Sequence, residues 1–257
     1  MMYKKYLPQL ARLRARRPLV HCLTNQVTIN LVANSLLALG ASPIMSHSPV
    51  EVEEVCSLSQ ALCLNIGGLS KQTLRSMLLA GGVANQRGIP VVLDPVGAGV
   101  TAWRAQVCQL LLKEIKITAI RGNASEVRAL AGLETESHGV DSAYPVEEAH
   151  TAADILARRH GLVVALTGVR DYVCNATQNW QIEGGHELMA QVSGMGCAVS
   201  ALLAAWLSVD DDSLGSAVAV VGLAGFCGRK AGKQANGPGS FVPLWLDELH
   251  QVGKTET

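Results

Sequence analysis

Short apolar runs alternate with longer amphipathic segments along most of the 257-residue chain. The short runs are rich in aliphatic residues and end at Gly, Asn or Asp, which is typical of buried strands. We expect strands over Leu19–Leu23, Ala41–Met45, Ala61–Ile66, Ile89–Leu93, Ile117–Ile120 and Leu162–Leu166. The longer segments predict helices over Val27–Leu39, Lys71–Gln86, Ala102–Lys113 and Val146–Arg159. This alternation predicts an α/β fold with a mostly parallel central sheet and helices on both faces.

The pattern changes after Arg170. Two short runs, Tyr172–Cys174 and Trp180–Glu183, flank the polar segment Asn175–Asn179 and predict a hairpin. Three helices are expected to close the chain, over Cys197–Leu207, Ser213–Gln234 and Val242–His250. Because no linker or repeat divides the sequence, we expect residues 1–257 to form a single domain.

Composition narrows the classes of protein and partner. Hydrophobic residues make up 49% of the chain and charged residues 16%, which excludes a disordered chain. Lys and Arg number 21, Asp and Glu also number 21, and aromatic residues make up only 4%. Proteins that bind nucleic acid usually carry a basic excess and aromatic side chains for base stacking, so we expect no nucleic-acid partner.

The apolar segments and the cysteines indicate in which cellular compartment the protein is expected. The most apolar stretch, Leu214–Cys227, has about 14 residues, fewer than the roughly 20 of a membrane span, so we expect no membrane partner. The 7 cysteines include no CxxC pair, which disfavours a disulfide framework or a zinc site. Reduced, buried thiols are typical of a cytoplasmic protein. The basic segment before Pro18 predicts a surface helix, with an organelle-targeting segment as the alternative.

Polar residues or glycines stand at the ends of most predicted strands. These positions are Thr24-Asn25, Met45, Gly67-Gly68, Asp94, Arg121-Gly122-Asn123 and Thr167-Gly168. In a doubly wound sheet, ligands bind at the carboxyl ends of the strands. Several such positions at one edge therefore predict a ligand site.

Two acidic residues at this edge are candidate metal ligands. Asp94 directly follows a strand, and Glu126 lies three residues after Asn123 at a strand-to-helix junction. On strands that are neighbours, Asp94 and Glu126 could hold Mg²⁺ through oxygen ligands and water. The alternatives are a turn Asp and a capping box formed by Asn123 and Glu126, and capping is compatible with metal binding. We expect Gln at position 126 to preserve the cap.

The segment Gly194-Met195-Gly196-Cys197 opens a long apolar helix. Two glycines let the backbone approach a ligand, and the free N–H groups at a helix start attract anions. A structural turn before the helix is the alternative. At this position we expect the helix dipole to lower the pKa of the Cys197 thiol, whereas the other six cysteines read as inert core residues.

Eight short motifs occur in the same order as in one protein family. They are His21-Cys-Leu-Thr-Asn25, Ala33-Asn-Ser-Leu-Leu-Ala-Leu-Gly-Ala-Ser-Pro-Ile-Met45, Asn65-Ile-Gly67, Asp94-Pro-Val-Gly-Ala-Gly99, Arg121-Gly-Asn-Ala-Ser-Glu126, Thr167-Gly168, Gly194-x-Gly-Cys197 and Gly237-Pro-Gly-Ser-Phe241. Together they cover nearly the whole chain. On these motifs the sequence resembles the hydroxyethylthiazole kinases of the ribokinase-like superfamily.

The resemblance implies a ribokinase-like fold and phosphorylation of the hydroxyethyl group of 4-methyl-5-(2-hydroxyethyl)thiazole in thiamine biosynthesis and salvage. It also implies ATP, Mg²⁺ and a homotrimer with active sites at subunit boundaries. On matching positions it implies three sets of residues: substrate binding by Asn25, Met45, Gly68 and Gly194, ATP binding by Arg121, Asn123, Thr167 and Gly196, and metal binding by Asp94 and Glu126. Cys197 stands where most members of the superfamily carry an Asp that acts as the catalytic base.

Two residues depart from the family pattern. Met195 and Gly68 both stand where Thr is usual. Because the anion-binding groups near Met195 are backbone amides, we expect that site to remain intact.

Two other functions stay open. One is a ribokinase-like kinase of another small alcohol, such as a hydroxymethylpyrimidine or a sugar, although a sugar site would need more hydrogen-bonding side chains than Leu31–Met45 offers. The other is a thiazole- or nucleotide-binding sensor that has lost catalysis, which the retained Asp94 and Arg121 disfavour.

Overall fold

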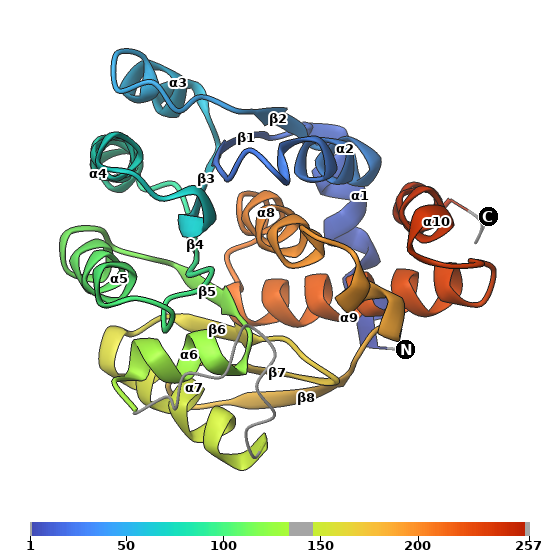
Figure 1. Cartoon of the computed structure of the whole chain (residues 1–257). Coiled ribbons are helices and arrows are strands. Elements are labelled where there is room, and N and C mark those ends of the chain that lie inside the picture. Colours follow the sequence, from blue (N-terminus) through green and yellow to red (C-terminus); the bar gives the residue numbers. More distant parts are fainter. Residues whose placement is uncertain (1, 134–145, 255–257) are drawn as a thin grey trace.

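The computed structural model describes residues 2–133 and 146–254 and is built around one eight-stranded sheet (Figure 1). Its strands are β1 (Leu19–Leu23), β2 (Ser42–Ile44), β3 (Ala61–Asn65), β4 (Val91–Asp94), β5 (Ala119–Gly122), β6 (Val163–Leu166), β7 (Arg170–Cys174) and β8 (Asn179–Glu183). The strand order is β2-β1-β3-β4-β5-β6-β7-β8. Strands β1 to β6 are parallel, and the β7–β8 hairpin adds two antiparallel strands. The predicted mostly parallel sheet and the predicted hairpin are both confirmed.

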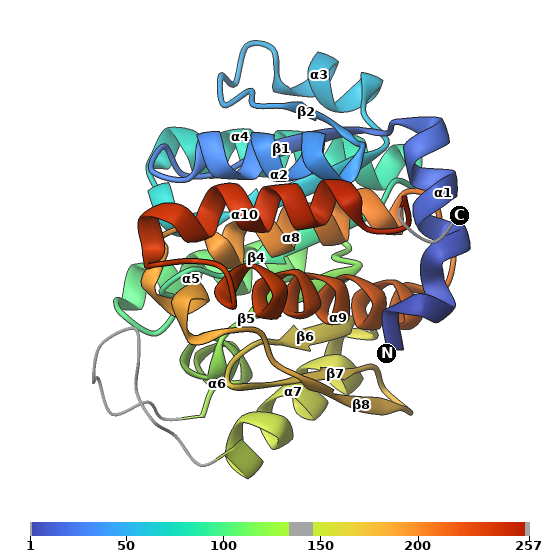
Figure 2. The same cartoon turned by 90° about the vertical axis from the view of Figure 1, so that its right-hand side faces the viewer.

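Helices form a layer on each face of the sheet (Figures 1 and 2). One layer contains α3 (Val52–Leu58), α4 (Lys71–Arg87), α5 (Ala102–Glu114), α6 (Ala124–Ala131) and α7 (Val146–His160). The other contains α1 (Leu7–Arg16), α2 (Ile29–Leu39), α8 (Met195–Leu207), α9 (Ser213–Gly232) and α10 (Pro238–Gln251). The prediction of helices on both faces is therefore correct.

The central strands contribute side chains to two separate cores, because successive side chains of a strand point to opposite faces of the sheet. On β3, Ala61 and Cys63 pack into the core beneath α8 and α9, whereas Leu62 and Leu64 pack into the core beneath α4 and α5. Small side chains on the first face let α8 lie close to the strands. This close approach brings the start of α8 to the carboxyl edge of the sheet.

By length and composition alone, helix α9 is long and apolar enough to cross a membrane. Its 20 residues exceed the apolar stretch Leu214–Cys227 noted in the sequence. Most of it is buried inside the molecule. A helix that is apolar all round is typical of the core of a large domain as well as of a membrane span.

The N-terminal basic segment forms the surface helix α1, as predicted. Its Leu10 and Leu13 are buried against the core. The Arg14 guanidinium donates hydrogen bonds to the carbonyls of Leu39 (3.1 Å) and Val252 (2.6 Å), which lie at the C-terminal ends of α2 and α10. Arg14 thus joins three helices by satisfying carbonyls that helix ends leave unpaired.

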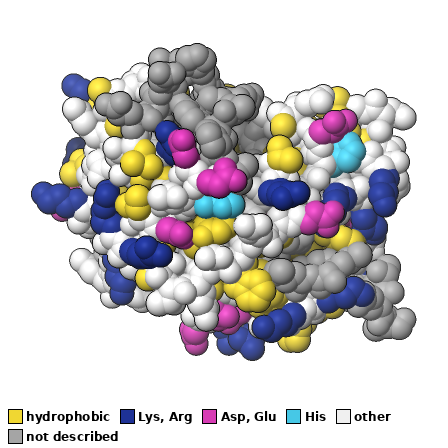
Figure 3. Space-filling model, turned by 90° about the horizontal axis from the view of Figure 1, so that it is seen from below, with side chains coloured by type: hydrophobic (Ala, Val, Ile, Leu, Met, Phe, Trp, Pro, Cys, Tyr) yellow, Lys and Arg dark blue, Asp and Glu magenta, His cyan; other side chains and the backbone are white. Residues whose placement is uncertain are grey.

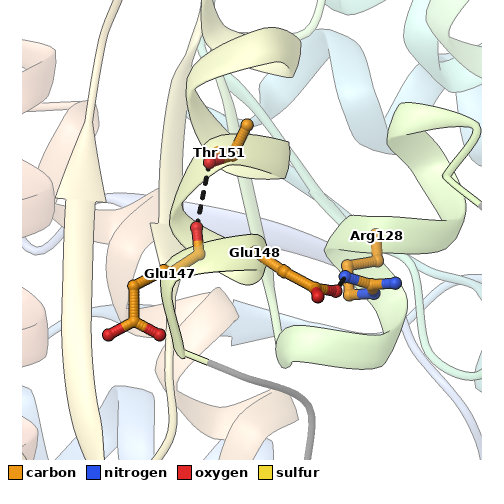
Figure 4. A network of polar contacts seen from close by, with 4 residues as sticks. All are labelled: Arg128, Glu147, Glu148 and Thr151. Carbon is orange, nitrogen blue, oxygen red and sulfur yellow. Dashed lines mark hydrogen bonds and ion pairs between the residues drawn. The ribbon is translucent and has the colours of Figure 1, made fainter.

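Helices α6 and α7 contact each other through charged residues on the layer beneath β5 and β6. Arg128 of α6 forms an ion pair with Glu148 in the first turn of α7 (Figure 4). In the same turn, the Thr151 hydroxyl donates to the Glu147 carbonyl over 2.9 Å. The ion pair fixes the start of α7 against α6.

The charged residues on the face in Figure 3 are interspersed, with Lys and Arg side chains among Asp and Glu. This mixture fits the formal net charge of +0. On this face, therefore, the electrostatic field lacks a single dominant sign.

Several boundaries differ from those expected. Strand β4 begins at Val91 because Pro90 precedes it and has no N–H to donate to a ladder. Helix α8 begins at Met195, two residues before the expected start, so Cys197 lies in its first turn. Helix α3 was not expected, since its seven residues are too few to show a periodic pattern.

Candidate active site

The candidate residues gather at the carboxyl edge of the parallel strands. Asn25 follows β1, Met45 follows β2, and Thr167 follows β6, while Asp94 and Arg121 lie in the last residues of β4 and β5. Because β1 to β6 all run in the same direction, these strand ends meet at one edge. The prediction that polar strand ends share an edge is confirmed.

A hydrogen-bonded network at this edge centres on Asn65, the last residue of β3. Its Nδ2 donates to Asp94 Oδ2 over 2.6 Å and to Cys197 Sγ over 3.1 Å. Its Oδ1 accepts from the Gly67 N–H (2.9 Å) and from Asn25 Nδ2 (3.2 Å). Asn25 Nδ2 also lies 3.7 Å from Cys197 Sγ. Residues from three strand ends and one helix start are thus bonded together.

Asp94 is fully buried within this network. Burial raises the pKa of its carboxyl to about 6, and the positive charge of Arg121 opposes that rise. Oδ2 accepts the bond from Asn65, but Oδ1 has no hydrogen-bond partner among the described residues. A buried carboxylate oxygen without a partner is suited to a cation ligand.

Glu126 lies in the first turn of α6, one strand away from Asp94. Its Oε2 accepts from the Asn123 N–H over 2.8 Å, and Asn123 Oδ1 accepts from the Glu126 N–H over 2.9 Å. This pair is the predicted capping box. Oε1 accepts from the Gly97 N–H over 3.0 Å. Glu126 therefore caps α6 and anchors the turn after β4.

The donor set fits Mg²⁺ only if other ligands complete it. No cluster of three or more His, Cys, Asp or Glu residues occurs within the described parts of the chain. Asp94 supplies carboxylate oxygens at the end of β4, and Glu126 supplies them from the first turn of α6, which follows the neighbouring strand β5. Mg²⁺ typically takes one or two carboxylates together with substrate phosphates and water, so this sparse set suits a metal that arrives with a nucleotide.

Arg121 and Thr167 lie together beside the start of α8. The Arg121 guanidinium donates to the Thr167 hydroxyl. It also lies so close to Gly196 that a methyl group on this glycine would overlap it. Arg121 is half-buried, which leaves its planar fork able to pair with phosphate oxygens.

The loop after Thr167 is held by Asp171, a residue that sequence reasoning did not single out. Its Oδ1 accepts from the Gly168 N–H over 2.9 Å. Burial raises the pKa of the Asp171 carboxyl to about 6, and the Gly168 bond and the charge of Arg121 oppose the rise.

Gly194 positions the start of α8. Its φ of +92° is in the left-handed region, and a Cβ there would lie 2.7 Å from Thr28 Cγ2. Only glycine combines that backbone with such a close approach. The side chain of Met195, which stands where Thr is usual, is buried in the core. The helix starts at Met195, so its first N–H groups have no partner within the helix, and their role as an anion site stays a prediction.

The pKa of the Cys197 thiol differs from the lowered value that its position at a helix start predicts. Burial raises its pKa to about 12, and the nearby Asp94 charge adds to the rise. Arg121 and hydrogen bonds from Asn65 and Thr28 lower the pKa, but by less. The expectation of a lowered pKa is wrong because desolvation outweighs the helix-start effect. All seven cysteines are free, and the other six are buried, as predicted.

The loops that follow β1 and β2 are joined by two histidines. His21 Nε2 lies 2.9 Å from the Ser46 carbonyl, and His47 Nε2 lies 2.6 Å from the Thr24 carbonyl. Met45, between these anchors, packs partly against the core. The loops are thus held side by side.

Gly68 lies in the turn that follows β3 and is exposed. It is close to Asn25, because a Cβ on Gly68 would be 3.2 Å from the Asn25 Cβ. Arg104 of α5 fixes this loop by donating to the carbonyls of Ile66 (2.8 Å) and Gly67 (3.1 Å). Sequence reasoning gave no role to Arg104 or to the two histidines, since their partners are backbone atoms far along the chain.

A family model and the sequences of known proteins both match this chain to the same protein family. The model of the hydroxyethylthiazole kinase family matches residues 10–255. A hydroxyethylthiazole kinase of Nitratidesulfovibrio vulgaris (strain DP4) is 44% identical over 243 residues, which is 95% of this chain and 91% of that protein.

Solved structures extend the likeness to the fold. A hydroxyethylthiazole kinase structure from Pyrococcus horikoshii OT3 has a TM-score of 0.89 at 39% identity, covering 97% of this chain and 94% of that one. A ribokinase-like superfamily protein from Enterococcus faecalis has a TM-score of 0.64 at 13% identity, covering 93% and 88% of the two chains. At that identity only the fold is shared, and it is the ribokinase-like fold expected from the sequence.

Proposed function

The chain belongs to the hydroxyethylthiazole kinase family, and we propose that its site transfers the γ-phosphoryl group of ATP to the hydroxyl of 4-methyl-5-(2-hydroxyethyl)thiazole. The supporting observation is the network in which Asn25 Nδ2, Cys197 Sγ and Asp94 Oδ2 are all bonded to one side chain, that of Asn65. An alcohol at Asn25 and a phosphoryl group at the start of α8 would meet there. The reaction supplies the phosphorylated thiazole for thiamine synthesis and salvage.

The thiazole would lie where the loops after β1, β2 and β3 meet. Asn25 offers a side-chain amide, Met45 an apolar surface, and Gly68 and Gly194 an open backbone. A small flat ring suits a site with few polar contacts. The alcohol would then point toward Cys197 and the first turn of α8.

The nucleotide phosphates would lie along the ends of β5 and β6 and the start of α8. Arg121 and Thr167 would contact phosphate oxygens, and Asn123 would lie beside them at the start of α6. The N–H groups of Gly196 and its neighbours would face the charge on the transferred group. Phosphoryl transfer needs this neutralisation and alignment more than covalent chemistry from the protein.

Asp94 and Glu126 are the residues that would hold Mg²⁺. When bound with ATP, the ion would neutralise charge on the β- and γ-phosphates. The unpartnered Oδ1 of Asp94 supports this assignment. Glu126 would contribute while both of its oxygens continue to accept backbone N–H groups.

Cys197 is proposed to contact the reacting hydroxyl without acting as a strong base. With its pKa raised to about 12, the thiol is protonated at neutral pH. In a loose transition state the alcohol loses its proton late, so a strong base contributes little. Cys197 and the α8 backbone would then align the alcohol oxygen with the γ-phosphorus. As the new P–O bond forms, the bond from that phosphorus to the departing ADP oxygen breaks, and the alcohol proton passes to an oxygen of the transferred phosphoryl group.

The same proposal includes one kinase domain over residues 1–257 and a homotrimer. Val27 and Val50, in the loops that follow β1 and β2, are 80% and 92% exposed. Both lie close along the chain to the substrate candidates Asn25 and Met45. Apolar residues so exposed beside a site favour a neighbouring subunit that covers it.

Steady-state ADP formation tests the reaction. We expect it to require both Mg²⁺ and hydroxyethylthiazole. A protein that makes ADP with a hydroxymethylpyrimidine or ribose, but not with this alcohol, would refute the substrate assignment. Tight thiazole binding without any ADP would favour the sensor.

A further inference from the structure

Asn65 is bonded to three candidate site residues, Asn25, Asp94 and Cys197, although the resemblance gives it no role. It ends β3, between the strands that carry Asn25 and Asp94, and only 2% of its surface is exposed. We propose that Asn65 is a positioning residue for phosphoryl transfer, whose amide holds Asn25, Cys197 and Asp94 in one productive arrangement. The proposal rests on the proposed function of the site as an alcohol kinase.

The Asn65 amide is fully used. A carboxamide has two N–H donors and an oxygen with two lone pairs. Both hydrogens are donated, to Asp94 Oδ2 and Cys197 Sγ, and both lone pairs accept, from Gly67 N and Asn25 Nδ2. The reverse orientation would put the amide oxygen against a carboxylate and the amide hydrogens against N–H donors. The partners therefore fix one orientation of the side chain.

This orientation decides which atoms of the neighbours stay free. Because Asp94 Oδ2 accepts from Asn65, Oδ1 is the oxygen left for a cation. Because Asn25 Nδ2 donates to Asn65 and Cys197, its Oδ1 is left to accept from a substrate hydroxyl. The Cys197 sulfur accepts from both amides, so its own hydrogen points away from them.

A local structural role accounts for only one of the four bonds. Asn65 caps the short turn Ile66–Gly68 by accepting from the Gly67 N–H. The other three partners lie 29, 40 and 132 positions away along the chain. All three belong to the proposed site.

Two substitutions separate these bonds. Asn65→Asp keeps the two accepting bonds, loses the bond donated to Cys197, and replaces the amide donor to Asp94 by a second carboxyl that must share a proton with it. Asn65→Ala loses all four bonds. Asn85→Asp is the matched control, because Asn85 is bonded through both ends of its amide to the Lys116 backbone (3.0 and 2.7 Å), on α4 and away from the site. For each variant we would measure kcat, KM, melting temperature, and the Kd of the thiazole alcohol by calorimetry without metal or nucleotide.

We expect Asn65→Asp to lower kcat roughly 10- to 100-fold, as for other residues that orient a ligand-binding shell, while the alcohol Kd stays near that of the wild type. Asn65→Ala should lower kcat and also weaken alcohol binding, since Asn25 loses its anchor. Asn85→Asp should lower only the melting temperature. A purely structural role would not produce this division between kcat and Kd.

The wild type is assayed first on several alcohols, so the two proposals fail separately. If it phosphorylates an alcohol other than the thiazole, the substrate assignment is wrong, and the variants are measured with that alcohol. Wild-type kcat in Asn65→Asp, or an equal loss of kcat in Asn85→Asp, would overturn the positioning role. If Asn65→Asp does not fold, an unchanged kcat in Asn65→Ala would overturn it.

Discussion

The backbone N–H of Gly97 donates a 3.0 Å hydrogen bond to Oε1 of Glu126, and this bond joins the turn after β4 to the first turn of α6. The other carboxylate oxygen accepts from the Asn123 N–H. Glu126 therefore organises two loops at the site, whether or not a metal is bound. Its substitution should affect stability as well as catalysis.

Glu126→Gln tests this double role. Gln preserves a capping box, and from the sequence alone little loss of stability is expected. In the structure, however, both Glu126 oxygens accept N–H groups, and Gln has only one acceptor oxygen. We expect the free energy of unfolding to fall by about 1–3 kcal/mol, and turnover to fall in a way that high Mg²⁺ partly relieves. Thermal denaturation and ADP assays across Mg²⁺ concentrations check both. Lower stability with unchanged turnover would leave Glu126 a purely structural role.

Gly196→Ala should impair nucleotide use. The new methyl group would overlap the Arg121 guanidinium, so we expect the guanidinium to shift and its bond to Thr167 to weaken. We expect the ATP KM to rise roughly tenfold, with a smaller change in the alcohol KM, because a charge-assisted hydrogen bond is worth about 1.5–3 kcal/mol. Gly82→Ala on α4 is the control, since a Cβ there meets no atom within 4 Å. An unchanged ATP KM would place the phosphates elsewhere.

Cys197 can be tested by the pH dependence of turnover. A thiol whose pKa is raised to about 12 stays protonated through neutral pH, so wild-type turnover should show no rise through a thiol pKa between about pH 6 and pH 9. Cys197→Ala should lose less than the roughly 100-fold that removal of an essential base costs, and Cys197→Asp should remain active. A rise at a thiol-like pKa, together with an inactive Cys197→Ala that still binds ATP, would show that the thiolate is required.

Asp171→Asn should stabilise the protein at high pH. The folded pKa of Asp171 is raised from 3.8 to about 6, so the native state binds more protons than the unfolded state between these values. Its contribution to stability therefore falls as pH rises through that window. Asn keeps an oxygen that can accept from the Gly168 N–H but carries no charge. We expect the variant to gain about 1–3 kcal/mol over the wild type at pH 8 and less at pH 4. A gain independent of pH would contradict this reasoning.

Val50→Asp should weaken the proposed trimer. Sedimentation of the wild type should give three times the 27.1 kDa mass of one chain. Because Val50 is exposed beside the substrate loops, a charge there should favour smaller species and raise the alcohol KM. Leu58→Asp, at a leucine that is 63% exposed and ends α3 away from the candidate site, should leave assembly unchanged. A fully active wild-type monomer would exclude sites that need two subunits.

The order of strands and helices, and the edge at which the site lies, follow from the sequence. Strand β1 and the start of α4 have the bounds expected from their apolar runs, and Asn123 and Glu126 form the capping box that their spacing predicts. These features depend on residues a few positions apart. The backbone preferences and side-chain periodicity of such residues can be read from a short stretch of sequence.

The chemistry inside the site was decided by tertiary structure. The thiol of Cys197 lies at a helix start, yet its pKa is raised, because burial and the charge of Asp94, about a hundred residues earlier, outweigh the local dipole. Asn65 falls inside the expected strand Ala61–Ile66 and received no role from the sequence. Its partners come from the loop after β1, from β4 and from α8. Desolvation and hydrogen-bond partners depend on which distant segments pack together, so local sequence fixes the elements but not the environment they enclose.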